Sequence, residues 1–260
     1  MTKIGSMNHI VQYDLRGYKG RLLYCSDVHG HFDLLGTELR NMAFSPGNGD
    51  LLFSGGDWID RGPQSGDVLK WLNKTWVHSV QGNHEDMHIQ AFQSNYNYQV
   101  CYNAATLAQH GGLWAFTMLD EEPEKLGQII NRFEELPIAM ELLTDWGTVG
   151  IIHADVPYSS WESFKNVTRT EFENHILGEA QWSRRRYKGR DVRGVDSVDL
   201  VLVGHTPTRS TKVEQLGNVV YTDAGTIRSG NINIVEINKD LFKKVKENEF
   251  ETGETRLARS

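Results

Sequence analysis

The stretch LLYCSDVHG at residues 22–30 joins a short apolar run to a polar cluster, and this order recurs four times further along the chain. The apolar run predicts a buried strand, so Asp27 and His29 come where that strand ends. Four more polar clusters follow apolar runs: GDWIDRG (56–62), GNHE (82–85), HAD (153–155) and GHTP (204–207). Strand ends in an α/β sheet open into one crevice, so we expect the five clusters to meet there.

Strands alternate with helices over the first third of the chain. We expect a strand at 21–26, a strand at 50–54, a helix at 68–72 and a strand at 76–80. A further helix should follow the first strand, since one face of it would carry Leu34, Leu35, Leu39 and Met42 at helical spacing. This alternation predicts an α/β layer arrangement.

The rest of the chain predicts a helical segment followed by a second β layer. Helical patterns cover 104–118 and 122–135, and we expect a helical cap over about 86–136. The stretches 138–143 and 148–153 predict a hairpin. Further strands are expected at 200–203, 211–215, 219–222 and 231–237, the last three completing the second β layer. Residues 1–260 are expected to form a single domain, with a frayed charged tail over about 240–260.

Composition excludes several classes of protein. The formal net charge is -7, which argues against nucleic acid as the main partner because phosphate neutralisation needs a basic face. No apolar run approaches the length of a membrane span, so no membrane partner is expected. Residues 1–7 lack a signal-peptide core, and the chain has only 2 cysteines, too few for a disulfide framework. We therefore expect a cytoplasmic protein.

The polar clusters offer oxygen and nitrogen ligands in a mixture that suits a pair of divalent first-row metal ions. Asp27 and His29 flank one residue, and alternate positions at a strand end point the same way. A carboxylate at Asp57 can bridge two ions. Any one cluster alone is more simply a turn, but five in this order make coincidence a poor explanation. A two-metal site suggests hydrolysis of a phosphate ester.

In its five polar clusters and in their order along the chain, this sequence resembles the calcineurin-like metallophosphoesterases from about Arg21 to Ile237. Within them it is similar to the phosphoprotein phosphatase family, in particular to the bacteriophage-lambda-type and bacterial serine/threonine protein phosphatases. The resemblance implies a four-layer β sandwich flanked by helices, with two metal ions at its edge. It assigns one ion to Asp27, His29 and Asp57, and the other to Asp57, Asn83, His153 and His205. Mn²⁺ is the expected metal, with iron or zinc as alternatives.

The same resemblance implies roles in catalysis. A hydroxide bridging the metals would attack phosphorus, and His84 would protonate the leaving oxygen as general acid, oriented by Asp60. Arg61 would bind the phosphate oxygens, and so would Arg184, because WSR (182–184) matches a Trp-x-Arg pattern of the family. The nearby arginines are expected to lie on a solvated loop: Arg185, Arg186, Arg190 and Arg193.

Two activities remain open on these residues. The first is a protein phosphatase acting on phosphoserine and phosphothreonine, and also on phosphotyrosine; the alternative is a symmetrical diadenosine tetraphosphate hydrolase. By resemblance, Asp60 and Glu85 favour the phosphatase, whereas Pro63 favours the tetraphosphatase. A catalytically inactive binding module would lack a ligand or the acid, and none is missing. The compact bacterial relatives act alone, so no obligatory regulatory subunit is expected beside the phosphoprotein substrate.

Overall fold

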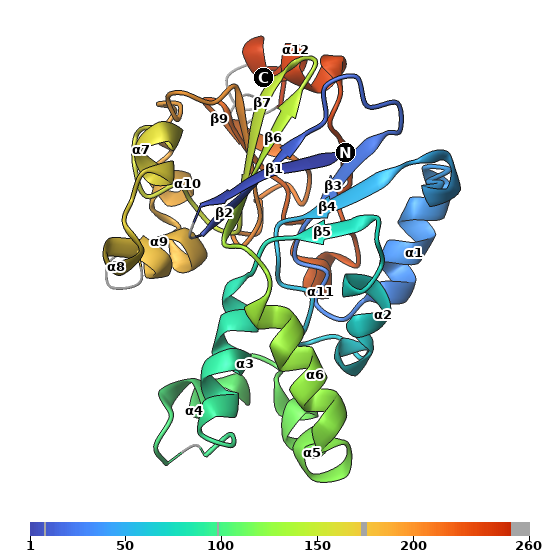
Figure 1. The fold of residues 1–260 in the computed structure, drawn as a ribbon, viewed down its shortest axis with the longest axis vertical. Coiled ribbons are helices and arrows are strands. Elements are labelled where there is room, and N and C mark those ends of the chain that lie inside the picture. The colour runs from blue at the N-terminus through green and yellow to red at the C-terminus, as the bar shows by residue number, and fades with distance from the viewer. Residues whose placement is uncertain (8, 98, 173–175, 251–260) are drawn as a thin grey trace, which may run out of the picture.

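The structure is a computed structural model, and it describes residues 1–7, 9–97, 99–172 and 176–250. Two β sheets form its centre and helices lie outside them (Figure 1). The larger sheet contains, in spatial order, β1 (Thr2–Met7), β2 (Ile10–Asp14), β6 (Ala139–Thr144), β7 (Gly147–Ile152), β8 (Leu200–Val203), β10 (Val219–Tyr221) and β9 (Glu214–Leu216). The smaller contains β11 (Val235–Glu236), β3 (Leu22–Cys25), β4 (Leu51–Ser54) and β5 (Val77–Ser79).

Alternation of side chains along β3 explains how the layers stack. Leu22 and Tyr24 pack into the core between the sheets, where they meet side chains of the larger sheet such as Ile151. Leu23 and Cys25 point the other way, into a second core beneath the helices. All four are buried, because successive residues of a strand face opposite sides and both sides of this sheet are covered.

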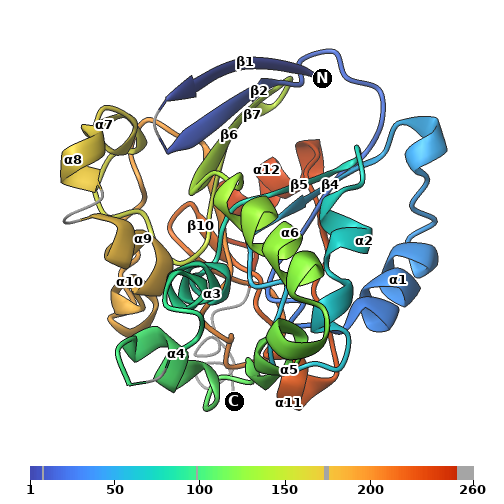
Figure 2. The same ribbon diagram turned by 60° about the horizontal axis from the view of Figure 1, so that its bottom comes forward.

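Helices form the two outer layers (Figure 2). On the side of the smaller sheet lie α1 (Phe32–Asn41), α2 (Leu69–Leu72), α3 (Asn83–Gln93), α4 (Tyr102–Leu107), α5 (Leu113–Glu121) and α6 (Pro123–Glu134), with the short helices η1 (Pro46–Asn48) and η2 (Ser65–Asp67). On the side of the larger sheet lie α7 (Trp161–Lys165), α8 (Arg169–Glu171), α9 (Leu177–Trp182) and α10 (Arg185–Lys188). The remaining helices are α11 (Thr226–Ser229) and α12 (Lys239–Lys246). The four layers confirm the predicted α/β sandwich.

Three details differ from the expectations. The strands β1 and β2 were not predicted, and they extend the larger sheet at its edge. The stretch 231–237 contributes only β11, which pairs antiparallel with β3 and so belongs to the smaller sheet, not to the second layer. The single helix expected over 104–118 is two helices, α4 and α5. They are separated at Gly111, whose φ of +88° is a conformation that favours glycine.

Helices α3 to α6 lie below the two sheets in the view of Figure 1. They cover the stretch of sequence for which a helical cap was expected. The charged tail begins with a helix instead of a frayed segment. Helix α12 buries Leu241, Phe242 and Val245 against the core between the sheets, and the end of the expected tail, residues 251–260, lies outside the described residues. That the whole chain is one domain stays a prediction. Within the described ranges, no helix is both long and apolar enough to span a membrane.

Candidate active site

The five polar clusters follow five strands, as predicted, and the strand directions bring them together. Strands β3, β4 and β5 are parallel neighbours, and β7 is parallel to β8. The carboxyl ends of parallel strands meet at one edge of a sheet. The loops after them are joined by backbone hydrogen bonds, for example from the His29 N–H to the Asp57 carbonyl at 3.0 Å. Within each sheet the candidate residues therefore converge by topology, and contacts such as that of His153 Nδ1 with the Gly55 carbonyl at 2.7 Å join the loops of the two sheets.

Backbone strain is concentrated in these loops. Six candidate residues have a positive φ, which side chains other than glycine rarely adopt: Asp27, His29, Asp57, Asp60, Arg61 and His205. Such strain persists at functional sites where surrounding contacts enforce it. Glu85 supplies one such contact, since its buried carboxylate accepts hydrogen bonds from the N–H groups of Asp57 (2.9 Å), Trp58 (2.8 Å) and Gly82 (2.8 Å). Glu85 thus holds the second and third clusters together.

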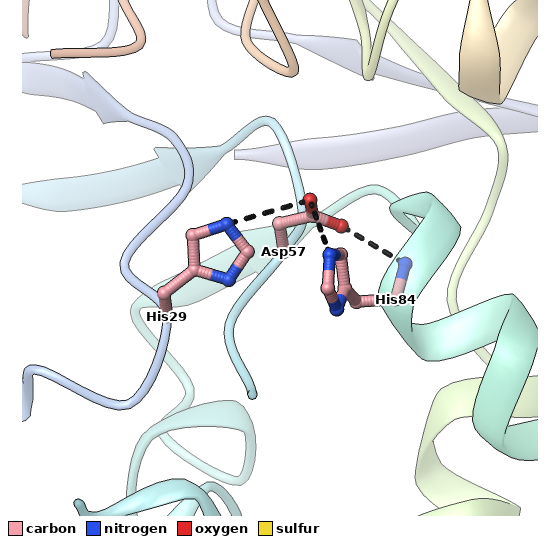
Figure 3. Close-up of side chains that lie close together, drawn as sticks. All are labelled: His29, Asp57 and His84. Atoms are coloured by element: carbon pink, nitrogen blue, oxygen red, sulfur yellow. Dashed lines mark hydrogen bonds and ion pairs between the residues drawn. The ribbon is translucent and has the colours of Figure 1, made fainter. Parts of the chain in front are cut away.

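Asp57 lies at the centre of the site. Its Oδ2 is 3.8 Å from His29 Nε2 and 3.9 Å from His84 Nε2, and its Oδ1 accepts the His84 N–H at 3.1 Å (Figure 3). On the other side, Oδ2 is 3.4 Å from His153 Nε2. Two groups could each hold a metal ion: His29, Asp57 and His84, and Asp57, His153 and His205. Asp57 is common to both groups, which is the arrangement that a bridging carboxylate requires.

The hydrogen bonds of His29 and His153 leave one ring nitrogen of each without a proton, as binding of a metal ion requires. A carbonyl oxygen only accepts, so His29 Nδ1 must donate to Ile59 O (2.8 Å) and His153 Nδ1 to Gly55 O (2.7 Å). Each Nε2 therefore carries a lone pair directed at the cleft. His153 Nε2 faces two further acceptors, Asn83 Oδ1 at 2.8 Å and Asp57 Oδ2 at 3.4 Å. Backbone contacts of this kind fix the tautomer of metal-binding histidines.

Burial shifts the pKa values of these groups toward their neutral forms. It lowers the pKa of His153 to about 3 and that of His205 to about 2, so both imidazoles are neutral, the form in which a histidine can bind a metal. Burial also raises the pKa of Asp57 well above its usual value, with the charges of Asp27 and Glu85 adding to the shift. Buried carboxylates beside neutral imidazoles suit a divalent cation, which would supply the missing positive charge.

Asp27 makes contacts that set it apart from the other predicted ligands. Both Asp27 carboxylate oxygens accept the His205 N–H, at 3.0 and 2.9 Å, and Asp27 lies outside the two groups. His84 stands with His29 and Asp57 instead. Asp27 nevertheless lines the same cleft, and a Cβ on Gly204 would overlap its carboxylate, so a glycine is needed there.

The proposed acid and its partner are in direct contact. His84 Nδ1 lies 2.6 Å from Asp60 Oδ2, and both side chains are buried. The other oxygen of Asp60 contacts His88 Nε2 at 2.8 Å and accepts the Trp114 indole N–H at 2.7 Å. Burial works to raise the pKa of Asp60, but His88 and His84 outweigh it and hold that pKa well below its usual value. Burial lowers the pKa of His84, and Asp60 works against that shift.

Neither His88 nor Trp114 was identified as a site residue from the sequence. His88 is fully buried, and its Nδ1 contacts the Tyr96 hydroxyl at 2.8 Å. The available signal was spacing, because His88 follows His84 by four residues and so lies on the same face of α3. Trp114 comes from α5 and carried no such signal.

The two proposed phosphate-binding arginines reach one cleft of about 650 Å³, together with His84, Asp57 and His205. Arg61 donates to His29 Nε2 at 2.7 Å, and Arg184 donates to the His205 carbonyl at 3.2 Å.

The arginines around Arg185 were expected on a solvated loop, and only some of them are exposed to solvent. Arg186 is largely buried and pairs with Asp155 at 3.0 Å, because Asp155 follows His153 at the end of β7 and lies beneath this loop. Arg185 pairs with Glu179 at 3.1 Å and Arg193 with Asp191 at 2.8 Å, and both arginine side chains stay exposed.

Comparison with known proteins agrees with this geometry. Residues 20–218 match the family model of the calcineurin-like phosphoesterases. The chain is 31% identical over 211 residues to serine/threonine-protein phosphatase 2 of Escherichia coli (strain K12), which covers 81% of this chain and 90% of that protein. The protein belongs to the calcineurin-like phosphoesterase family. It is therefore a phosphoesterase, an enzyme of a family that works with a dimetal centre.

Two further likenesses carry less weight, the first because it covers a short stretch and the second because the sequence identity is low. A symmetrical bis(5'-nucleosyl)-tetraphosphatase of Serratia proteamaculans is 45% identical over 67 residues, which is 25% of this chain and 23% of that protein. A solved protein serine/threonine phosphatase from Saccharomyces cerevisiae superposes with a TM-score of 0.59 at 17% identity, covering 83% of this chain and 70% of the other. The structural likeness supports the fold alone.

Proposed function

We propose that this enzyme is a metal-dependent protein phosphatase that hydrolyses phosphoserine and phosphothreonine, and phosphotyrosine as well. The observation that carries the proposal is the buried contact of Asp60 with His84 at 2.6 Å. By resemblance, tetraphosphatases usually lack an acid at this position. The relative named as a serine/threonine phosphatase matches 81% of the chain, whereas the tetraphosphatase matches 25%. Symmetrical diadenosine tetraphosphate hydrolysis is the second candidate.

The assignment of the metal-binding residues rests on the family resemblance, and the shared position of Asp57 in two groups of candidate ligands supports it. We propose that Asp27, His29 and Asp57 hold one divalent ion, and that Asp57, Asn83, His153 and His205 hold the other. Mn²⁺ is the first candidate, and iron and zinc are the alternatives. When bound, such ions would neutralise phosphate charge and make water a stronger nucleophile.

The residues of the chain then have separate roles in the reaction. Arg61 and Arg184 would bind the phosphate oxygens, since a planar guanidinium matches two oxygens at once. His84 directs Nδ1 to Asp60, so Nε2, which is 3.9 Å from Asp57 Oδ2, is the nitrogen that can protonate the leaving oxygen. Asp60 stabilises the charged imidazole before this transfer. The cytoplasmic location and the lack of an obligatory regulatory subunit stay predictions.

The experiment that tests the proposal compares substrates under one set of conditions. Initial rates are measured on a phosphothreonine peptide, a phosphotyrosine peptide and diadenosine tetraphosphate, with Mn²⁺ and after removal of metal with a chelator. We expect the phosphothreonine peptide to be cleaved fastest and chelation to abolish the activity. Faster cleavage of the dinucleotide would contradict the proposal and support the second candidate.

Substitution of His88 should weaken the function of His84, the proposed general acid, because His88 contacts Asp60. In His88→Ala, Asp60 Oδ1 keeps only Trp114 as a side-chain partner, so the His84–Asp60 geometry should loosen. A hydrogen bond to a charged group contributes about 1.5–3 kcal/mol, so stability in urea should fall by a similar amount. Cleavage of the phosphothreonine peptide should fall more than cleavage of 4-nitrophenyl phosphate, whose leaving group needs no acid. His88→Gln is the conservative control, and an equal fall for both substrates would show a merely structural role.

A further inference from the structure

Three cations beyond Arg61 and Arg184 line the same cleft: Lys188, Arg209 and Arg228. They come from three separate segments, namely α10, the loop after His205, and α11. All three side chains are exposed, so they face solvent at the cleft and not the core. The proposed chemistry on the scissile phosphate uses none of them.

The backbone of each segment is hydrogen-bonded to the site. The Lys188 N–H donates to the Arg184 carbonyl at 2.9 Å. The Arg209 N–H donates to the hydroxyl of the buried Tyr187 at 2.9 Å. At the start of α11, the Thr226 hydroxyl donates to the Asp27 carbonyl at 2.9 Å. Each of the three segments is therefore bonded to a residue that lines the cleft, namely Arg184, Tyr187 or Asp27.

Two of these cations, Lys188 and Arg228, have no carboxylate bound to them among the residues that the structure describes. Across the described part of the chain, neither Lys188 nor Arg228 forms an ion pair, in contrast to Arg185 and Arg186, which pair with acids. Asp223 also lines the cleft; its buried carboxylate accepts the Gly225 N–H at 2.7 Å and lies in the field of Arg61, Arg184 and Arg228, which together carry more charge than this one carboxyl can neutralise. The protein as a whole has a net charge of -7, so this cationic end of the cleft is opposite in sign to the overall charge.

We propose that Lys188, Arg209 and Arg228 form a subsite for a second anionic group of the substrate, an acidic side chain close in sequence to the phosphorylated residue. This inference rests on the proposed protein-phosphatase function and names a feature of its substrates. Guanidinium groups bind carboxylates through paired hydrogen bonds, and an ammonium adds a point charge. Exposed ion pairs are individually weak and screened by salt, so three of them should change kcat/KM on the order of tenfold at low ionic strength.

The test uses two phosphothreonine peptides that differ only in having glutamate or glutamine on both sides of the phosphorylated residue. The measured quantity is the ratio of kcat/KM for the glutamate peptide to that for the glutamine peptide. We expect about tenfold in the native enzyme at low salt, arising mainly in KM, and a ratio near one at about 0.5 M salt, where charges are screened. In the triple variant Lys188→Gln, Arg209→Gln, Arg228→Gln, the ratio should fall to about one at low salt. Because the ratio is internal to each enzyme, a general loss of activity does not affect it.

The matched control is Arg185→Gln, which removes an exposed cation from the same helix as Lys188 but outside this cleft. It should keep the native ratio. A native ratio near one, or a high ratio retained by the triple variant, would overturn the subsite and leave the phosphatase proposal intact. If 4-nitrophenyl phosphate is cleaved and neither peptide is, the proposed function fails and the subsite with it. If the triple variant loses only diadenosine tetraphosphate cleavage, the cations serve a polyphosphate and the peptide subsite is wrong.

Discussion

Asp57→Asn will lose both tightly bound metal ions and essentially all phosphatase activity. Asp57 is the one residue common to both groups of candidate ligands, and its Oδ2 lies within 3.9 Å of three histidine Nε2 atoms. An amide keeps the shape but offers one neutral oxygen in place of two that share a negative charge. Metal content after gel filtration measures the loss directly. A variant with two retained ions would refute the bridging role.

Stability gives a second measure of the same substitution. A ligand at about a hundred times its Kd stabilises the native state by about 2.7 kcal/mol, so Mn²⁺ should raise the unfolding midpoint of the native enzyme. That rise should be absent in Asp57→Asn. Asp86→Asn is the matched control, because Asp86 is a partly buried carboxyl on α3 that belongs to neither group. It should retain the full rise with Mn²⁺.

Without metal, Asp57→Asn should no longer lower the stability of the protein, and its effect on stability should depend on pH. Burial raises the pKa of Asp57, as do Asp27 and Glu85, so the native state binds a proton there more tightly than the unfolded chain. The metal-free enzyme should therefore lose stability as the pH rises through this raised pKa and regain it as the pH falls. Asp57→Asn removes that dependence and should equal or exceed the native stability at neutral pH. Urea unfolding at several pH values, in a chelator, checks this sign.

His84→Asn will slow hydrolysis of the phosphothreonine peptide by about 10²–10⁴-fold, the usual contribution of a general acid. The buried contact of His84 with Asp60 at 2.6 Å supports this role. The effect on 4-nitrophenyl phosphate should be much smaller, since its leaving group departs without a proton. Unchanged turnover of the peptide would remove His84 from the mechanism.

Metal content separates the two roles that the structure allows His84. Its Nε2 lies in the group with His29 and Asp57, so it could be a ligand instead of an acid. We expect both ions to remain bound in His84→Asn. Loss of one ion, with equal slowing of both substrates, would assign His84 to the metal.

The sequence by itself determined the strands β3, β4 and β5 of the smaller sheet, the hairpin of β6 and β7, and the five polar clusters at strand ends. These features depend on local periodicity and on residues adjacent to apolar runs, which one stretch of chain contains in full. The convergence of His153 and His205 was also predictable, because β7 and β8 are parallel and end at a common edge, whereas the packing of the two sheets brings Asp57 of the other sheet to them. The direction of the Asp27 carboxylate, toward the His205 N–H, was not.

Only the tertiary structure decided how the site is supported and which cations share its cleft. Asp60 is held by Trp114, 54 residues away, and the Arg186 side chain is buried against Asp155, 31 residues away. Strand β11 pairs with β3, although most of the chain separates the two strands in sequence. The cations Lys188, Arg209 and Arg228 line one cleft, although they come from three segments. Contacts of this kind depend on how helices and loops pack on the finished sandwich. Local sequence patterns contain no record of which distant side chain fills a given space.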